Sequence, residues 1–257
     1  SSTGTSAPWP AAVSAVATYT DAEHPLLTER EDPKRAAVLV VTSDRGMAGA
    51  YSSSVLREAE ARLQSLRDEG KEPVLYVYGR RGESYFKFRK VEMERVWTGS
   101  SDNPSPETAQ EIAEEMLERF LADAEDGGVA ELHTVFTRFE SMVKQVVQVR
   151  RMLPLEVVEA EGEEGDTEEY PLYEFEPSAK DVFDALLPMY VSQRIHAVLL
   201  IAAACELASR QQAMHAATDN AKELIEDYTR LANNARQAEI TTEITELISG
   251  ADALANS

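Results

Sequence analysis

The sequence predicts an α/β fold, in which a Rossmann-like domain with a largely parallel sheet is followed by a long C-terminal coiled-coil helix. Two observations predict it. In the first two thirds of the 257-residue chain, short apolar runs alternate with helical patterns, as in domains whose helices cover a mostly parallel sheet. From Met189 to about Leu254 there is no proline, and the only glycine is Gly250. Strong helix formers dominate that stretch.

The chain divides into three predicted segments. Residues 1–35, which open Ser/Thr/Pro-rich, are expected to be disordered or to hold a short helix at 11–20. Residues 36–176 form the α/β domain, with an acidic excursion at 155–173, and residues 177–257 form the long coiled-coil helix.

Strands and helices are expected to alternate through the α/β domain. The continuous apolar run 36–41 predicts a strand buried on both faces. The next helix has Val55, Ala59 and Leu63 on one face and ends at Gly70. The further strands are expected at 73–78, 91–98, 130–139 and 143–153, with a short aromatic helix at 80–89.

Prolines mark the starts of two more helices. Pro106 opens a helix that runs toward Gly127, and Pro177 opens the helix that leads into the C-terminal stretch. Pro188 is expected to interrupt that helix just before Met189.

The C-terminal stretch predicts a rod about 90 Å long, at 1.5 Å per residue. A compact domain of this size cannot bury such a rod, so part of it should pack against another helix. Its apolar residues recur in steps of three and four, as in a coiled-coil seam. They are Met214, Ala217, Ala221, Leu224, Tyr228, Leu231, Ala235 and Ala238, after which the stripe shifts to Ile240, Ile244, Leu247, Ala251 and Leu254.

The composition excludes several classes of function. The formal charge of −21 argues against nucleic acid and against a basic patch for anionic lipid. The single cysteine, Cys205, rules out a disulfide framework. No apolar run approaches the length of a membrane span, and 197–204 is too short. Any association with a membrane is therefore expected to come through partners.

The loop 43–49 follows a strand and precedes a helix, where phosphate loops lie in doubly wound folds. It lacks both G-x-G-x-x-G and the ending of a Walker loop. We interpret it as a tight turn with Asp44 near the N-terminus of the following helix, and we expect no cofactor.

Two further groups of residues bear on binding. The histidines have no metal-ligand spacing, and the acidic run 159–169 is interpreted as a solvated loop, so no metal site is expected. Tyr173 and Phe175 lie among acidic residues that include Glu176, which suggests either a contact with a partner or aromatic rings folded back on the sheet. The histidines are His24, His133, His196 and His215.

A string of residues on the C-terminal stretch resembles the signature of the gamma subunit of bacterial F-type ATP synthases. The string comprises Ser209-Arg210, Arg236-Gln237-Ala238, Ile240-Thr241, Glu246-Leu247-Ile248 and Gly250-Ala251. The loop 42–49 is also similar to the family's T-S-D-R-G-L-x-G, with Met47 for leucine and, beyond it, Ser52 where asparagine is common. The resemblance extends over about 11–254. The family begins with a long basic helix, and 11–20 is too short to be that helix.

The resemblance implies a rotor shaft that couples proton-driven rotation of the membrane c-ring to ATP synthesis in a hexamer of alpha and beta subunits. Such a subunit is not itself catalytic, and it lies peripherally on the cytoplasmic face of the plasma membrane. The family's epsilon subunit would bind the α/β domain.

Site residues are implied position by position. Arg210, Gln237, Thr241 and Glu246 match family positions that touch catch loops of the beta subunits, and Arg236 neighbours Gln237 in the same motif. Separately, Tyr173, Phe175 and Glu176 match the foot of the rotor, which contacts the c-ring.

Two other classes of protein remain as alternatives. The first is a ligand-binding protein or enzyme of doubly wound fold with a helical oligomerisation arm, but the strand-end loops offer no nucleophile–base pair and no phosphate cradle. The second is a coiled-coil adaptor, which leaves the Arg236-Gln237 motif unexplained.

Overall fold

The computed structural model describes residues 34–141, 144–154 and 179–255, and the side chains of 184–251 within the last range. The described strands form one five-stranded sheet in the order β3-β2-β1-β4-β5. The strands are β1 Arg35–Val41, β2 Glu72–Tyr78, β3 Arg95–Trp97, β4 Glu131–Ser141 and β5 Lys144–Leu153. Strands β1 to β4 run parallel, and β5 pairs antiparallel with β4 at one edge. The sheet is therefore largely parallel, as predicted.

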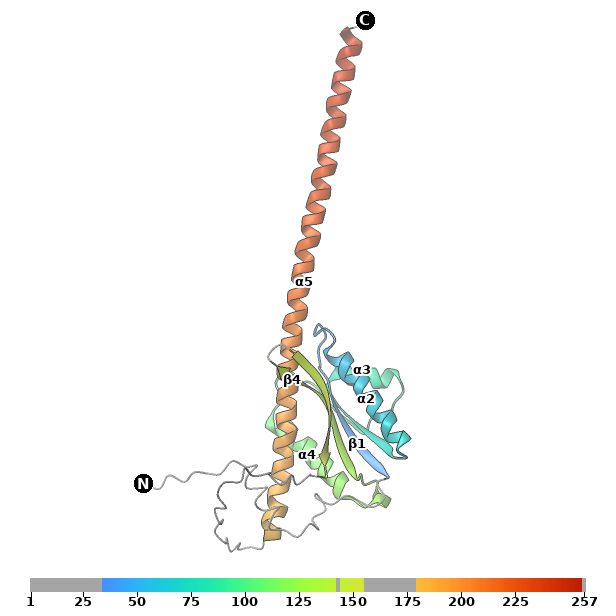
Figure 1. Ribbon diagram of the computed structural model, residues 1–257, viewed down its shortest axis with the longest axis vertical. Helices are drawn as coiled ribbons and strands as arrows, with labels where there is room; N and C mark the ends of the chain where they lie inside the picture. Colours follow the sequence, from blue (N-terminus) through green and yellow to red (C-terminus); the bar gives the residue numbers. More distant parts are fainter. Residues whose placement is uncertain (1–33, 142–143, 155–178, 256–257) are drawn as a thin grey trace, which may run out of the picture. The chain divides into compact units, whose positions relative to one another are not determined.

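The helices cover both faces of this sheet (Figure 1). They are α2 Tyr51–Asp68, α3 Arg80–Phe88, α4 Pro106–Leu121 and α5 Ala179–Ala255, with a short 3-10 turn at Ala124–Asp126. Helix α4 begins as the sequence suggests, because Pro106 occupies the first turn and the Ser105 hydroxyl accepts a hydrogen bond from the Thr108 N–H.

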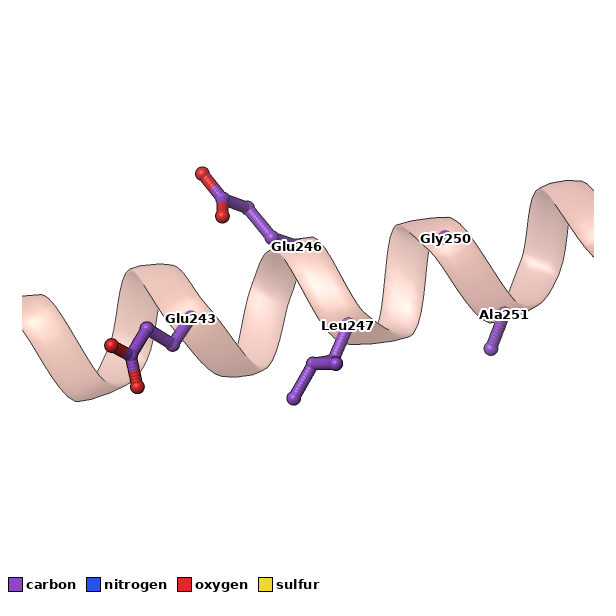
Figure 2. Close-up of a pocket in the computed structure, with 5 residues that line it drawn as sticks. All are labelled: Glu243, Glu246, Leu247, Gly250 and Ala251. Carbon is purple, nitrogen blue, oxygen red and sulfur yellow. The ribbon is translucent and has the colours of Figure 1, made fainter.

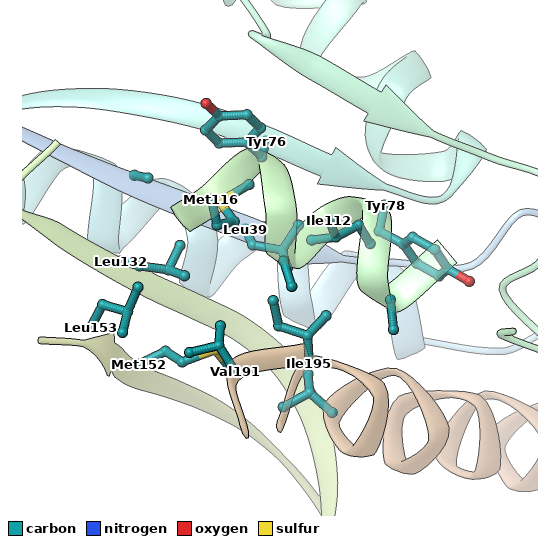
Figure 3. Close-up of a cluster of buried hydrophobic side chains, with 14 of the residues drawn as sticks. Leu39, Tyr76, Tyr78, Ile112, Met116, Leu132, Met152, Leu153, Val191 and Ile195 are labelled. Carbon is teal, nitrogen blue, oxygen red and sulfur yellow. The ribbon is translucent and has the colours of Figure 1, made fainter. Parts of the chain in front are cut away.

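Alternate residues of the buried strands point into two separate cores. On one face Ala36, Val38 and Val40 of β1 pack with α2 and with Phe86 of α3. On the other face Leu39 packs with α4 and with the first part of α5, where Val191 and Ile195 contribute (Figure 3). This period of two in a strand buried on both faces explains why its sequence is continuously apolar.

The predicted strands agree with the observed ones to within a residue or two, except at 91–98. There only Arg95–Trp97 pair, in parallel with Tyr76–Tyr78. Lys90, with φ of 57°, and Val91, whose N–H donates to the Phe86 carbonyl, belong to the turn that ends α3. The alternating pattern identified a segment with one side buried, but five of its eight residues do not pair with a strand.

The prediction that Pro188 interrupts the last helix is wrong. Helix α5 contains Pro188 in its interior and extends over 77 residues. Proline removes one backbone hydrogen bond and crowds the preceding turn, at a cost of about 3 kcal/mol. Burial offsets this cost, because Leu187 and Val191 on either side of Pro188 are both fully buried in the core with α4.

The structure divides into two compact units, Ser1–Ser209 and Arg210–Ser257. The first contains the sheet and the buried part of α5. In the second, every residue from Met214 to Ala251 is exposed. Within α5, the stretch Asp184–Ala251 contains a window apolar enough, by length and composition, to cross a membrane. The prediction that no apolar run approaches this length is therefore wrong, although Val191, Ile195 and Leu199 show that the core helix of the first unit accounts for much of this apolarity.

Candidate functional site

The segments that follow the parallel strands β1, β2 and β3 meet at Asp44, which comes after β1. Its carboxylate accepts backbone hydrogen bonds from Arg80, Gly99 and Ser101, at N–O distances of 3.0, 2.8 and 3.0 Å. The Ser101 hydroxyl in turn accepts from the Asp44 N–H at 2.8 Å. Burial alone would raise the pKa of Asp44, but the N–H groups of Ser101, Gly99 and Arg80 outweigh it and hold the pKa below its usual value.

This arrangement fills the place where a doubly wound fold binds phosphate. Converging N–H groups at the strand ends and a helix N-terminus favour an anion, and here the chain supplies that anion itself. The prediction of a tight turn holds, with one correction. Asp44 caps the start of α3, whose first residue is Arg80, and not the start of α2.

Ser52, which takes the place of the family's common asparagine, also has a role in this turn. Its hydroxyl accepts from the Ser43 N–H at 3.2 Å and lies 2.8 Å from the Ser43 hydroxyl. It therefore ties the loop after β1 to the first turn of α2.

The residues assigned to the beta-subunit contacts lie on α5. Arg236, Gln237, Thr241 and Glu246 are all exposed, and Arg210 is half-buried. The Thr241 hydroxyl donates to the Gln237 carbonyl at 2.8 Å. At about 100° per residue, Gln237 and Thr241 share a face. Glu246, nine positions beyond Gln237, lies about half a turn around the helix.

Figure 2 shows the end of α5 at close range. Glu246 points away from the side of the helix that carries Glu243 and Leu247. A shallow depression there is lined only by α5, at Glu243, Glu246, Leu247, Gly250 and Ala251. One exposed helix cannot enclose a ligand. The polar residues of α5 therefore form no enclosed pocket, and they lie on different sides of the helix.

The remaining predicted site residues have different outcomes. Tyr173, Phe175 and Glu176 lie outside the described residues. Among the described ranges, no three His, Cys, Asp or Glu side chains gather as a metal site. His133, which the sequence left without a role, is buried, and its Nε2 lies 2.8 Å from Oε2 of Glu131. Glu131 also accepts from Lys71 at 2.8 Å, so these residues form a partly buried charged network between β4 and the turn after α2.

Comparison with known proteins decides the family. A family model described as ATP synthase matches residues 7–254. The chain is 60% identical over 246 residues to the ATP synthase gamma chain of Beutenbergia cavernae, a match that covers 96% of this chain and 82% of that protein. It is 56% identical to the ATP synthase gamma chain of Micrococcus luteus, with the same two coverages. The chain belongs to the ATP synthase gamma chain family.

Solved structures agree with this assignment at the level of the fold. A chain of the Euglena gracilis mitochondrial ATP synthase (OSCP/F1/c-ring) aligns with a TM-score of 0.60 at 17% identity, covering 96% of this chain and 86% of that one. A chain from the central stalk/c-ring structure of the Tetrahymena thermophila enzyme aligns with a TM-score of 0.57 at 20% identity, covering 74% and 80%. As a gamma chain, the protein is the central rotor shaft of an F-type ATP synthase.

Proposed function

We propose that this chain performs no chemistry itself and couples rotation of a c-ring to ATP synthesis in a hexamer of alpha and beta subunits. It would do so at the cytoplasmic face of a bacterial plasma membrane, peripherally, with an epsilon subunit on the α/β domain. The observation that carries the proposal is the exposure of α5 from Met214 to Ala251. Leu224, Tyr228 and Leu231, large apolar residues of the predicted seam, are 57%, 68% and 60% exposed, which indicates a surface that partners cover.

The mechanism follows from the shape and the polar residues of the helix. At about 1.5 Å per residue, the exposed part of α5 from Met214 to Ala251 extends over roughly 57 Å. Because Gln237 and Glu246 lie on opposite sides, one orientation of the helix presents different contacts to subunits around it. Turning the helix would shift each beta subunit among open and closed nucleotide states, provided the contacts differ between those states.

The absence of chemistry on this chain rests on Asp44. Its carboxylate already accepts hydrogen bonds from the N–H groups of Arg80, Gly99 and Ser101. A nucleotide phosphate at the strand ends would therefore have to displace the Asp44 side chain. The contacts of Tyr173, Phe175 and Glu176 with the c-ring are proposed from the family match alone.

Two measurements test the proposal. Calorimetry of the chain with ATP and with ADP should show no binding in the micromolar range, and a tight site would contradict the non-catalytic role. Mixing the chain with alpha and beta subunits should give a complex in which hydrolysis depends on the chain. Alpha and beta subunits that hydrolyse ATP equally well without it would contradict the coupling role.

A further inference from the structure

A groove of about 630 Å³ lies between α2 and α3, two helices on the same face of the sheet (Figure 1). Its lining includes Ser52, Leu56 and Arg57 of α2 together with Arg81, Tyr85 and Phe88 of α3. The loop of Asp44 and the polar residues of α5 do not line it. None of the side chains to which the rotor role assigns contacts therefore lines this groove.

An aromatic ring at this groove lies in solvent. Phe86 is fully buried beneath α3, whereas Phe88 is 87% exposed. Residues two apart on a helix do not share a face, so the fold that buries Phe86 turns Phe88 outward. A phenylalanine can bury 150 Å² or more at an interface. Leaving it in water beside Leu56 and Tyr85 is a feature of surfaces that bind a partner.

On this strongly acidic chain the lining of the groove carries two arginines, Arg57 and Arg81, and one carboxylate, Glu60, which is paired with Arg89. Arg57 and Arg81 are exposed, and neither guanidinium has a carboxylate within ion-pair distance among the described residues. Other arginines nearby are paired, because Arg62 contacts Glu69 and Arg89 contacts Glu60. In a chain with 46 acidic and 25 basic residues, two guanidiniums without a carboxylate beside an exposed ring indicate an anionic partner.

One wall of the groove is already fixed in place. Arg89 binds Glu60 of α2 at 2.7 Å, and its guanidinium lies 5.3 Å from the centre of the Tyr85 ring. These contacts join the C-terminal end of α3 to α2. A partner would therefore meet a preformed surface and would lose little free energy to ordering it.

We propose that this groove binds an acidic, amphipathic segment of a partner protein. An apolar side chain of that segment would cover Phe88, and its carboxylates would pair with Arg57 and Arg81. Nucleic acid and anionic lipid are disfavoured because the chain's charge of −21 repels an extended anionic surface. A second copy of this chain is disfavoured by the same repulsion. The proposal goes beyond the rotor role and does not depend on it.

The experiment measures fluorescence anisotropy of a labelled helical peptide with leucines on one face and glutamates on the other. A twin peptide carries glutamine in place of each glutamate. The whole chain should bind the acidic peptide about tenfold more tightly than the twin, since two charge-assisted pairs contribute at that scale. Binding should weaken as salt rises from 50 to 300 mM, values chosen to shorten the Debye length well below roughly 10 Å.

Matched variants locate the site. Arg57→Gln with Arg81→Gln should weaken binding of the acidic peptide about tenfold, and Phe88→Ala should weaken binding of both peptides. Arg67→Gln, at an exposed position further along α2, and Leu121→Ala, at an exposed residue of α4, should change neither. Equal binding of the two peptides, no binding at all, or equal losses in the control variants would overturn the proposal.

A second measurement identifies the occupant in the assembled enzyme. Ser84 is exposed at the groove, whereas the native Cys205 is buried, so Ser84→Cys gives one reactive thiol for a benzophenone label. After illumination, mass spectrometry should find the label attached to a stretch of partner protein rich in Asp and Glu. Attachment to another copy of this chain, to lipid or to a basic stretch, or no attachment at all, would overturn the proposal. The rotor role would be unaffected by any of these outcomes.

Discussion

The hydroxyl of Thr241 donates a hydrogen bond to the backbone carbonyl of Gln237, one helical turn earlier and 2.8 Å away. Threonine commonly bonds in this way within helices. The bond uses the hydroxyl proton, so Thr241 can only accept from a partner. The carboxamide of Gln237, on the same face, can both donate and accept. This pair therefore offers a partner a defined set of contacts, and Gln237 supplies the donor.

The first prediction concerns that pair in a complex with alpha and beta subunits. Gln237→Ala should leave the helix intact, because both residues are good helix formers. The lost hydrogen bond would cost about 0.5–3 kcal/mol at one step of the cycle and slow ATP hydrolysis several-fold. Adding Thr241→Ala should slow it further.

Gln211→Ala is the matched control, since it removes the same side chain from another exposed position of α5. Hydrolysis and assembly should stay near wild type in this variant. If the Gln237→Ala, Thr241→Ala double variant hydrolyses ATP as fast as the control does, the assignment of these two residues is wrong. Failure of the double variant to assemble would mean instead that they hold the complex together.

The second prediction concerns amide exchange along α5 in the isolated chain. Amides around Leu187 to Ala202 should exchange slowly, because the side chains there include fully buried core residues. Amides from Met214 to Ala251 should exchange quickly, because all of these residues are exposed and isolated helices fray. Hydrogen–deuterium exchange with mass spectrometry measures both. Strong protection of the second range in a proven monomer would show that it has a packing surface of its own.

The third prediction concerns Asp44. Asp44→Ala leaves three N–H groups without their acceptor and should lower the free energy of unfolding by roughly 3 kcal/mol or more, since a hydrogen bond to a charged group contributes about 1.5–3 kcal/mol. Asp102→Ala, which removes an exposed carboxylate paired with Arg45 at the same edge, should cost at most about 1 kcal/mol. Urea titration of both variants makes the comparison.

The Asp44→Ala variant also tests whether these N–H groups form an anion site. Formate, which restores a carboxylate without a tether, should raise the melting temperature of Asp44→Ala and leave that of Asp102→Ala unchanged. A variant that formate does not stabilise would indicate that Asp44 acts mainly through packing.

The fourth prediction is a loss of stability in acid that depends on Glu131 and His133. Burial would raise the pKa of Glu131, but hydrogen bonds from Lys71 and His133 outweigh it and lower the pKa. Burial lowers the pKa of His133. Both groups bind protons more readily in the unfolded chain, so both contribute stability at neutral pH. The contribution of His133 to the free energy of unfolding is lost as the pH falls below 6.5. The contribution of Glu131 is lost as the pH falls below 4.5.

The variants separate the two groups. Glu131→Gln should lower the free energy of unfolding at pH 7 by about 1–3 kcal/mol, because Lys71 keeps Glu69 but loses its second carboxylate partner. The variant should also flatten the dependence of that free energy on pH below 4.5. His133→Gln should flatten the dependence of the free energy of unfolding on pH below 6.5. Glu125→Gln, exposed in the 3-10 turn, is the control. If the free energy of unfolding of both variants depends on pH as that of the control does, this network does not cause the loss of stability in acid.

Much of the fold could be predicted because it rests on local patterns. The apolar run at β1, the Pro106 start of α4 and the long helical stretch of α5 all specify their elements directly. The contacts of Asp44 could not be predicted, because Arg80, Gly99 and Ser101 reach it only after β2 has paired with β1 and β3 with β2. The prediction that Pro188 interrupts α5 was wrong for the same reason. The burial of Leu187 and Val191, which offsets the cost of the proline, depends on tertiary packing. The spacing of four residues alone predicts that Gln237 and Thr241 share a face of α5. The exposure of Phe88 could be inferred only once the structure had shown that Phe86 is buried.

The most direct test of the rotor role is rotation of a single molecule. Because the only native cysteine, Cys205, is buried, Glu107→Cys at an exposed position of α4 gives one thiol on the α/β domain for a bead. With the alpha and beta subunits fixed to a surface, ATP should turn the bead in one direction, in three equal steps per revolution. Complexes that hydrolyse ATP while their beads show only Brownian motion would contradict the account.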